Sequence, residues 1–351
     1  MPANHPDILY FGRVDCSAPT APAFAWPGVT IRMQFDGTGV DMMLTDFGTA
    51  SEVNYYDVIL DGGTPTDLQV MPGAQTYQLA RNLAPGSHTV EIFKRIESAP
   101  GGAPDVGKGI FNGFRIPEAG SVLPLAPKPH RIEFIGDSIT CGYGVDVCTT
   151  DPNNSHYTTA ASNAYDAYGA VAARALDAEY MAVAYSGRGM YRNNSAAPQT
   201  IPDLYLLTLP DEASGPLWNT ARWTPDAVVV NLGTNDFYAA PTNDALYQNT
   251  YVTFLQTLRG YYPNAQIIVT TSPMLSNYYP TNPANNMIQT SWTDEDTDLE
   301  AVVAARNAAG DKNVVLLTIQ TQPGTCYGED YHPPVTVQQA MANQVVSAVS
   351  W

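Results

Sequence analysis

Positively charged residues are scarce in this sequence of 351 residues. Lysine and arginine together number 16, against 34 aspartates and glutamates, so the formal net charge is −18. The lysines are Lys94, Lys108, Lys128 and Lys312, and no basic cluster occurs. Proteins that bind nucleic acids or anionic membranes need such clusters. We therefore expect no nucleic-acid or membrane partner, whereas a neutral, hydroxyl-rich ligand such as a polysaccharide meets no repulsion.

Long apolar runs are also missing. No run reaches the roughly 20 residues that a membrane-spanning helix needs. Residues 1–10 show no signal-peptide pattern. A mature chain with an added methionine is compatible with such a start, so this absence does not indicate a cytosolic protein.

Cysteine is sparse as well. The four cysteines are Cys16, Cys141, Cys148 and Cys326. No Cys-x-x-Cys pair or Cys/His spacing suggests zinc, and we expect neither a metal nor a cofactor. Cys141 and Cys148 flank a short loop and are the candidate disulfide pair. Free buried thiols are an equally compatible alternative.

The first third of the chain has the pattern of an all-β domain. Alternating or β-branched segments recur between turn signals such as Asp61-Gly62-Gly63, with no long helical pattern among them. The predicted strands are residues 30–35, 40–45, 55–60, 76–80 and 88–95. This pattern predicts a β-sandwich or jelly roll over residues 1–118. Residues 119–129 are rich in proline and are the candidate linker, stiff enough to fix the arrangement of two domains.

Strands and helices alternate in the rest of the chain. The predicted strands are residues 132–135, 179–184, 227–232, 265–270 and 314–318. The predicted helices are residues 163–176, 247–259, 294–309 and 336–350. Such alternation predicts a parallel sheet covered by helices on both faces. We therefore expect residues 130–351 to form an α/β domain with three α/β/α layers.

Polar residues that can carry chemistry follow several of these strands. The first strand ends in Gly136-Asp137-Ser138, the second leads to Gly187 and the third to Asn235, while Asp330 and His332 follow the fifth. The carboxyl ends of parallel strands meet at one edge of the sheet, where active sites form. A serine nucleophile needs a base, an orienting group and donors for the oxyanion, and this set supplies them all. Taken alone, Gly-Asp-Ser is more typical of an ordinary turn.

The order of these blocks resembles that of SGNH hydrolases, also called GDSL esterases. The amino-terminal part is similar to the jelly-roll domain of carbohydrate esterase family two. The segments that carry this second resemblance are Gly12-Arg13-Val14-Asp15, Phe24-Ala25-Trp26-Pro27-Gly28, Lys94-Arg95-Ile96-Glu97 and Phe111-Asn112-Gly113-Phe114. The resemblance spans nearly the whole chain. It implies an SGNH-hydrolase α/β/α domain preceded by a jelly roll, and a secreted or periplasmic esterase that removes acetyl groups from plant cell-wall polysaccharides or oligosaccharides of the xylan or glucomannan type.

The resemblance and the chemistry together assign roles to the site. Ser138 is expected to attack the ester carbonyl, and His332 to accept its proton and return it to the leaving sugar hydroxyl. The N–H groups of Ser138 and Gly187 and the side-chain amide of Asn235 are the expected oxyanion donors. A turn or helix cap is the alternative role for Asn235.

The orienting group of His332 has more than one candidate. We expect Asp330 to orient the imidazole as the third member of a Ser-His-Asp triad. Glu329 is the competing carboxylate. Some members of the resembled family instead use a serine–histidine pair oriented by a backbone carbonyl, and the sequence leaves that arrangement open.

The substrate contacts and the overall activity also have alternatives. Tyr191, Tyr238 and Tyr331 lie in predicted loops and are candidates for stacking on sugar rings, although ordinary packing explains any single tyrosine as well. A broad-range GDSL lipase or arylesterase is the nearest alternative activity, although no long apolar lid is present. An inactive carbohydrate-binding protein is the alternative from another class. The oligomeric state is not predictable from the sequence.

Overall fold

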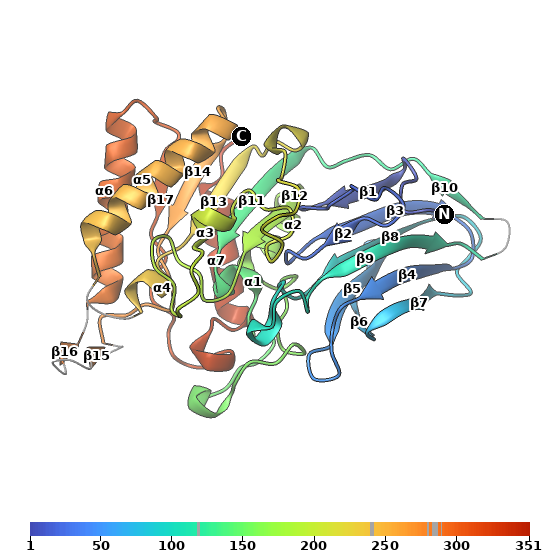
Figure 1. Cartoon of the computed structure of the whole chain (residues 1–351), viewed down its shortest axis with the longest axis horizontal. Helices are drawn as coiled ribbons and strands as arrows, with labels where there is room; N and C mark the ends of the chain where they lie inside the picture. The colour runs from blue at the N-terminus through green and yellow to red at the C-terminus, as the bar shows by residue number, and fades with distance from the viewer. Residues whose placement is uncertain (118–119, 239–241, 279–280, 283–286, 289) are drawn as a thin grey trace.

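Two antiparallel sheets and one parallel sheet organise the chain (Figure 1). The computed structural model describes residues 1–117, 120–238, 242–278, 281–282, 287–288 and 290–351. Strands β1 to β10 form the amino-terminal sheets, drawn on the right of Figure 1, and the parallel sheet with its helices lies on the left. The predicted domain boundary at residues 118 and 119 lies outside the described residues. The division into residues 1–118, 119–129 and 130–351 therefore stays a prediction.

The amino-terminal sheets form a β-sandwich. One sheet has the order β1-β3-β8-β5-β6, with β10 also paired to β3, and the other has the order β2-β9-β4-β7. The strands are β1 (Ile8–Phe11), β2 (Ala23–Phe24), β3 (Thr30–Asp36), β4 (Val40–Asp46), β5 (Asn54–Leu60), β6 (Thr66–Val70), β7 (Gly73–Ala80), β8 (Ser87–Lys94), β9 (Gly109–Arg115) and β10 (Ser121–Leu123). Alternate residues of β3 and β4, such as Met33 and Met42, are buried in one shared core. This alternation is what holds two sheets face to face.

The proline-rich segment is partly built into the sandwich. Strand β10 lies within residues 119–129 and pairs with β3 through Val122 opposite Phe35. Strand β1 pairs with the preceding residues of β3, so β1 and β10 share one edge of that strand. The segment predicted as a linker is thus anchored to the sheet before the chain enters β11.

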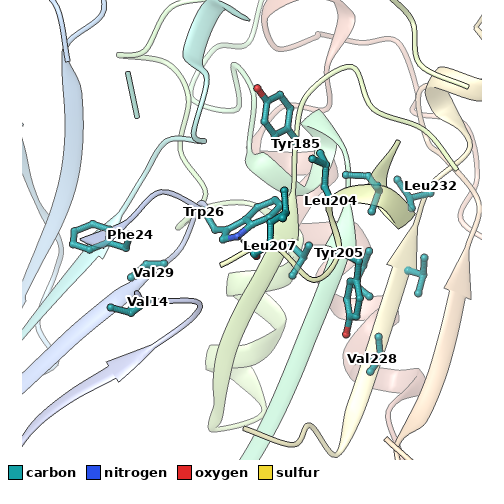
Figure 2. Packing of buried hydrophobic residues seen from close by; sticks show 14 of the residues in the cluster. Val14, Phe24, Trp26, Val29, Tyr185, Leu204, Tyr205, Leu207, Val228 and Leu232 are labelled. Carbon is teal, nitrogen blue, oxygen red and sulfur yellow. Dashed lines mark hydrogen bonds between the residues drawn. The ribbon is translucent and has the colours of Figure 1, made fainter. Parts of the chain in front are cut away.

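Buried polar contacts join the sandwich to the parallel sheet. Arg13 is fully buried, and its Nη2 donates to Glu133 Oε1 on β11 at 3.1 Å. The fully buried Trp26 donates from Nε1 to the carbonyl of Leu207 at 3.2 Å. Figure 2 shows Trp26 beside Leu207, with Val14 on the sandwich side. One continuous hydrophobic cluster includes residues of both parts.

The carboxyl-terminal part has the predicted parallel sheet. Its strand order is β12-β11-β13-β14-β17, and all neighbouring pairs are parallel. The strands are β11 (His130–Gly136), β12 (Ala178–Ala184), β13 (Ala227–Asn231), β14 (Gln266–Thr270) and β17 (Val314–Leu317), with a small separate hairpin of β15 (Thr281–Asn282) and β16 (Met287–Ile288). The helices are α1 (Ser138–Cys141), α2 (Tyr168–Ala175), α3 (Ile201–Leu204), α4 (Thr234–Phe237), α5 (Asp244–Tyr261), α6 (Ser291–Ala308) and α7 (Val335–Ala348).

Helices cover both faces of this sheet. Helices α2 and α7 pack together, as do α5 and α6. Successive residues of β11 point to opposite layers: Phe134 joins the cluster of α2 and α7, whereas Ile135 joins the cluster that contains residues of α5 and α6. Strands buried on both faces need apolar residues at every position, which explains their continuous apolar runs. The three-layer fold class predicted from the sequence is confirmed.

Candidate active site

The candidate nucleophile lies on a tight turn after β11. A side chain at Gly136 would place its Cβ 2.0 Å from Oγ1 of Thr140, so only glycine fits there. Asp137 caps α1 by accepting the N–H of Ile139 at 3.0 Å, which is a structural role for this carboxylate. Ser138 is the first residue of α1, and its position at the carboxyl end of β11 follows the rule for open α/β sheets.

Ser138 and His332 form a hydrogen-bonded pair. Oγ of Ser138 lies 2.7 Å from Nε2 of His332, although 194 residues separate them in the chain. Nδ1 of His332 lies 2.9 Å from the carbonyl oxygen of Glu329. A carbonyl oxygen only accepts, so Nδ1 carries the proton and Nε2 is left with a lone pair facing the serine hydroxyl. This tautomer is the one that a general base needs.

The backbone just before His332 has an unusual conformation. Asp330 and Tyr331 both have positive φ angles, 47° and 65°, which non-glycine residues seldom adopt. The bend lets the carbonyl of Glu329 accept both the N–H and the Nδ1–H of His332. The N–H of Asp330 donates to the carbonyl of Ser155 at 2.8 Å and holds the bend from outside. Strained backbone of this kind concentrates at functional sites.

The prediction that Asp330 orients His332 is wrong in this structure. The carboxylate of Asp330 faces away from the imidazole and accepts from Tyr143 Oη at 2.6 Å, from His156 Nδ1 at 2.8 Å and from the N–H of Tyr157 at 3.1 Å. With φ in the left-handed region, the side chain of Asp330 is turned toward the loop of residues 143–157. The pair with an orienting carbonyl, left open by the sequence, is the arrangement observed.

The competing carboxylate, Glu329, does not bind the imidazole either. Its two carboxylate oxygens accept from the N–H of Thr158 at 2.8 Å and from Oγ1 of Thr158 at 2.7 Å. Burial raises the pKa of Glu329, against the lowering effect of these bonds.

The pKa of Asp330 is lowered instead. Partial burial raises it, but the hydrogen bonds from Tyr143, His156 and the Tyr157 N–H outweigh that effect and bring the pKa below its usual range. Asp330 is therefore a fixed anion of the His332 loop.

The environment of His332 favours the neutral imidazole. Burial lowers its pKa from 6.5 to about 4. The ring of Tyr143 stacks on the imidazole, with the centroids 4.0 Å apart and the planes at 21°. Because the same Tyr143 donates its hydroxyl to Asp330, the tyrosine links the base to the carboxylate that does not touch it.

The three predicted oxyanion donors are the N–H groups of Ser138 and Gly187 and the side-chain amide of Asn235, and their role stays a prediction. In the described part of the chain, the N–H groups of Ser138 and Gly187 donate to no other protein group. Gly187 has φ +77°, and a Cβ there would lie 2.7 Å from Oδ1 of Asn194. Nδ2 of Asn235 donates to the carbonyl of Arg188 at 2.8 Å and to Asp137 Oδ2 at 3.1 Å, which places the amide beside the nucleophile turn.

Asp236 supports the loop that carries Gly187. Its carboxylate is buried and accepts three backbone N–H groups, from Met190 and Tyr191 at 2.8 Å and from Arg192 at 3.0 Å. Burial raises the pKa of Asp236 to about 6, against the lowering effect of these bonds. Asp236 thus ties the loop after β12 to the helix α4 that carries Asn235.

A cleft of about 370 Å³ adjoins the site. Residues next to the catalytic positions line it, among them Thr234 before Asn235, and Asp330 and Tyr331 before His332. Tyr238, 54% exposed, and Tyr331 both lie in its wall, and their role as substrate contacts stays a prediction.

Tyr191 lies elsewhere. Its hydroxyl accepts the N–H of Asn243 at 2.9 Å, and its ring packs edge-on against Tyr247. Ordinary packing, the alternative weighed for each tyrosine, describes its position.

The predicted disulfide pair is wrong. Cys148 is bonded to Cys326, whereas Cys141 is a buried free thiol in α1 and Cys16 is also free. The buried Sγ of Cys141 lies 3.7 Å from Glu97 Oε2. The observed bridge ties the loop after the nucleophile to the segment before His332. Thr149 and Tyr327 pair through their backbones beside it.

The sequence did not indicate several contacts of the site. His156 contacts the His332 loop, and Glu97 reaches Ser186 from the sandwich. Tyr143, a loop tyrosine in the glycine-flanked turn after the nucleophile, is a candidate for stacking on sugar rings, but no residue pattern indicated its contact with the His332 loop. Glu97 lies in a segment that carried the family resemblance, but nothing in the residue pattern indicated a contact with Ser186.

The parallel sheet is covered on both faces, and a serine follows one of its strands in hydrogen-bond contact with a buried histidine. This combination is typical of serine hydrolases of the α/β type. Comparison with known families agrees with that class. Residues 10–127 match the family described as "Carbohydrate esterase 2 N-terminal", and residues 134–333 match the "GDSL-like Lipase/Acylhydrolase family". The chain belongs to carbohydrate esterase family two, within the GDSL-like hydrolases.

Individual relatives support this assignment. The chain is 31% identical to an acetylxylan esterase / glucomannan deacetylase from Cellvibrio japonicus, over 78% of this chain and 74% of the relative. It is 33% identical to the cellulase/esterase CelE from Acetivibrio thermocellus over 99% of this chain, which spans 39% of that longer protein. A solved family two carbohydrate esterase from Clostridium thermocellum, in complex with cellohexaose, has a TM-score of 0.86 at 32% identity, with 97% of each chain covered.

Proposed function

We propose that this protein is an acetyl esterase that removes O-acetyl groups from plant cell-wall polysaccharides or oligosaccharides of the xylan or glucomannan type. The observation that carries the proposal is the 2.7 Å contact between Ser138 Oγ and a His332 whose proton is held on Nδ1. The family relatives named as acetylxylan esterase / glucomannan deacetylase give the substrate class.

The reaction follows from that contact. Ser138 Oγ attacks the acetyl carbonyl carbon while its proton moves to Nε2 of His332. The carbonyl π electrons move to the oxygen, and the tetrahedral intermediate collapses when the imidazolium gives the proton to the departing sugar oxygen. Water then attacks the acetyl-enzyme by the same route and releases acetate. The Glu329 carbonyl accepts the Nδ1–H throughout and keeps the imidazole in one orientation.

The developing oxyanion is bound by the N–H groups of Ser138 and Gly187. Both N–H groups can donate to the oxyanion because they make no other hydrogen bond within the described residues. We include the amide of Asn235 as the third donor, which requires its 3.1 Å bond to Asp137 to be shared with the oxyanion. Removal of one oxyanion donor typically lowers kcat about 10²–10³-fold.

The cleft beside His332 is the proposed sugar site. Tyr238 and Tyr331 offer aromatic faces in its wall, and carbohydrate rings pack well on such faces. A net charge of −18 does not repel a neutral glycan. The structural relative solved with cellohexaose shows that a member of this family holds a glycan.

We also propose that the protein works outside the cytoplasm. The Cys148–Cys326 disulfide supports this location because oxidising compartments stabilise such bonds. In the part of the chain that the structure describes, no helix is both long and apolar enough to cross a membrane.

Hydrolysis of aryl esters with increasing acyl length tests the proposal, with Ser138→Ala as the blank. We expect activity to fall steeply beyond acetyl, and acetate release from acetylated xylan and glucomannan. Activity that holds or rises with acyl length would support a lipase or arylesterase instead. No activity above the blank on any ester, with glycan binding retained, would support a carbohydrate-binding protein.

A further inference from the structure

A segment of the sandwich reaches the catalytic edge of the parallel sheet. Residues 94–98, which comprise the last residue of β8 and the four that follow it, are buried. The carbonyl of Arg95 accepts the N–H of Ala164 at 2.8 Å, and the Arg95 guanidinium pairs with Asp146 at 2.5 Å. These contacts fix the segment against loops that follow the nucleophile.

Glu97 is the residue of this segment that contacts the active-site loops. Its Oε2 accepts the N–H of Ser186 at 2.8 Å, and its Oε1 accepts the Ser186 hydroxyl at 2.5 Å. Oε2 also lies 3.7 Å from Sγ of Cys141, in the helix that begins with Ser138. One carboxylate therefore holds the backbone and the side chain of the same residue and touches the nucleophile helix.

Ser186 directly precedes Gly187, whose N–H is a proposed oxyanion donor. The peptide plane that carries this N–H includes the carbonyl of Ser186, so a rotation at Ser186 would swing the donor away. On the other side, the Gly187 carbonyl accepts the N–H of Asn194 at 3.0 Å. Asn194 and Glu97 thus fix the Gly187 peptide from both directions.

Burial makes the position of Glu97 energetically unfavourable for a charged carboxylate. Glu97 is 4% exposed, and the neighbouring Lys94 is fully buried, with its ammonium group donating to the carbonyls of Ile96 and Glu97. Buried charges are costly unless each is paired and hydrogen-bonded. Both carboxylate oxygens of Glu97 accept hydrogen bonds from Ser186. These bonds offset the cost of burying the carboxylate, and they act on the loop that carries Gly187.

We propose that Glu97 is a positioning residue for the oxyanion-binding N–H of Gly187, so that the sandwich supplies part of the esterase active site. The inference rests on the proposed function, since Gly187 needs precise placement only if an oxyanion forms there. A merely structural contact would affect stability without a specific effect on the chemical step.

Steady-state kinetics on an aryl acetate, with kcat and KM measured separately, test this role in the full chain. We expect Glu97→Ala to lower kcat by about 10²-fold, because the effect of losing a well-placed oxyanion donor is of that size, with KM changed by less than about threefold. Glu97→Gln should recover about 10-fold of this loss, since its amide oxygen can accept the Ser186 N–H while its NH₂ donates to the hydroxyl.

The Gln variant also guards against loss of the fold. Burial lowers the pKa of Lys94 to about 7, so the lysine can deprotonate near neutral pH when the Glu97 charge is removed. Lys108→Gln is the matched control, because it removes the ion pair with Glu212 between the same two parts of the chain without touching Ser186. We expect its kcat to be unchanged.

The outcomes separate the two proposals. An active wild type whose kcat is unchanged in both Glu97 variants would overturn the positioning role and leave the esterase intact. A raised KM with unchanged kcat, or an equal loss of kcat in Lys108→Gln, would also overturn it. A wild type with no activity above Ser138→Ala would overturn the proposed function itself.

Discussion

The ring of Tyr143 lies flat against the imidazole of His332, with 4.0 Å between the ring centroids, and its hydroxyl donates to Asp330 at 2.6 Å. The tyrosine therefore braces the base by contact and the preceding loop by a hydrogen bond. These two contributions are separable by substitution. The stack is retained in Tyr143→Phe and lost in Tyr143→Ala.

The first prediction concerns these two variants. Loss of one hydrogen bond is worth about 1 kcal/mol, so Tyr143→Phe should lower kcat/KM by no more than about 10-fold. Tyr143→Ala also removes the aromatic contact and opens space beside the base, and we expect a loss of about 10²-fold. Hydrolysis of an aryl acetate at pH 7 measures both. Equal activity of the two variants would show that the stack does not position His332.

Asp330→Asn tests which group orients the base. The carboxylate bonds Tyr143, His156 and the Tyr157 N–H, whereas the Glu329 carbonyl bonds His332. Asparagine tolerates the left-handed backbone at this position and keeps one acceptor oxygen. We expect kcat to fall by less than about 10-fold, with some loss of thermal stability.

His332→Ala is the reference for that experiment. Removal of a triad residue from a serine hydrolase lowers kcat by about 10⁴-fold or more. If Asp330→Asn approaches the loss seen in His332→Ala, Asp330 must act on the imidazole during catalysis, and the carbonyl-oriented pair would be wrong.

The pH profile is a third prediction. Burial lowers the pKa of His332 to about 4, and only the neutral imidazole can accept the Ser138 proton. As the pH falls, kcat/KM should stay level through pH 6.5 and reach half its maximum near pH 4. Between pH 6.5 and about 4, His332 is neutral in the folded state but binds a proton in the unfolded state. The free energy of unfolding should therefore decrease as the pH falls toward 4.

A competing titration can be recognised in the same profile. Burial raises the pKa of Asp137 to about 7, and this carboxylate bonds the amide of Asn235. If kcat/KM falls with a midpoint near pH 7, and this midpoint moves in Asp137→Asn, the decrease in activity is due to Asp137 rather than to His332. Assays after return to pH 7 separate reversible titration from acid unfolding.

The disulfide gives a fourth prediction. Thiol titration of the unreduced, denatured protein should find two free thiols, those of Cys16 and Cys141. Cys148→Ser should lower the free energy of unfolding by about 2–5 kcal/mol, because the bridge closes a long loop of the unfolded chain. Cys141→Ser leaves the bridge intact and serves as its control. A peptide map that joined Cys141 to Cys148 would contradict the structure.

The fold was predictable from the sequence to the extent that apolar periodicity determined it. The parallel strands, such as β13, are continuous apolar runs, and their location was predicted to within a residue or two. Short or polar edge strands gave no such signal: β6 is largely exposed, and β10 lies in a proline-rich segment that reads as a linker. Their pairing depends on partners far away in the chain.

The site divides in the same way. Ser138 and His332 were predictable because each lies in a recognisable block of residues, Ser138 directly after β11 and His332 further along the chain after β17. The orienting group was not, since the direction of the Asp330 side chain depends on two successive positive φ angles that the residue types do not indicate. The disulfide partner of Cys148 was likewise not predictable, because Cys326 lies 178 residues away and proximity in sequence favoured Cys141.

The last prediction concerns the buried contact between the sandwich and the parallel sheet. Arg13 and Glu133 are both fully buried, with Arg13 Nη2 3.1 Å from Glu133 Oε1, and Tyr205 Oη donates to the other carboxylate oxygen at 2.8 Å. Removal of one partner leaves an uncompensated charge in the interior. Arg13→Met should therefore lower the free energy of unfolding by about 3–5 kcal/mol, measured by urea denaturation.

Two further variants make this prediction specific. Arg13→Met combined with Glu133→Leu should be less destabilised than Arg13→Met alone, because no unpaired charge remains. Arg32→Met removes a partly exposed pair with Glu91, in which the two side chains are 19% and 26% exposed, and should cost at most about 1 kcal/mol. Similar losses in Arg13→Met and Arg32→Met would show that the buried pair is not what couples the two parts of the chain.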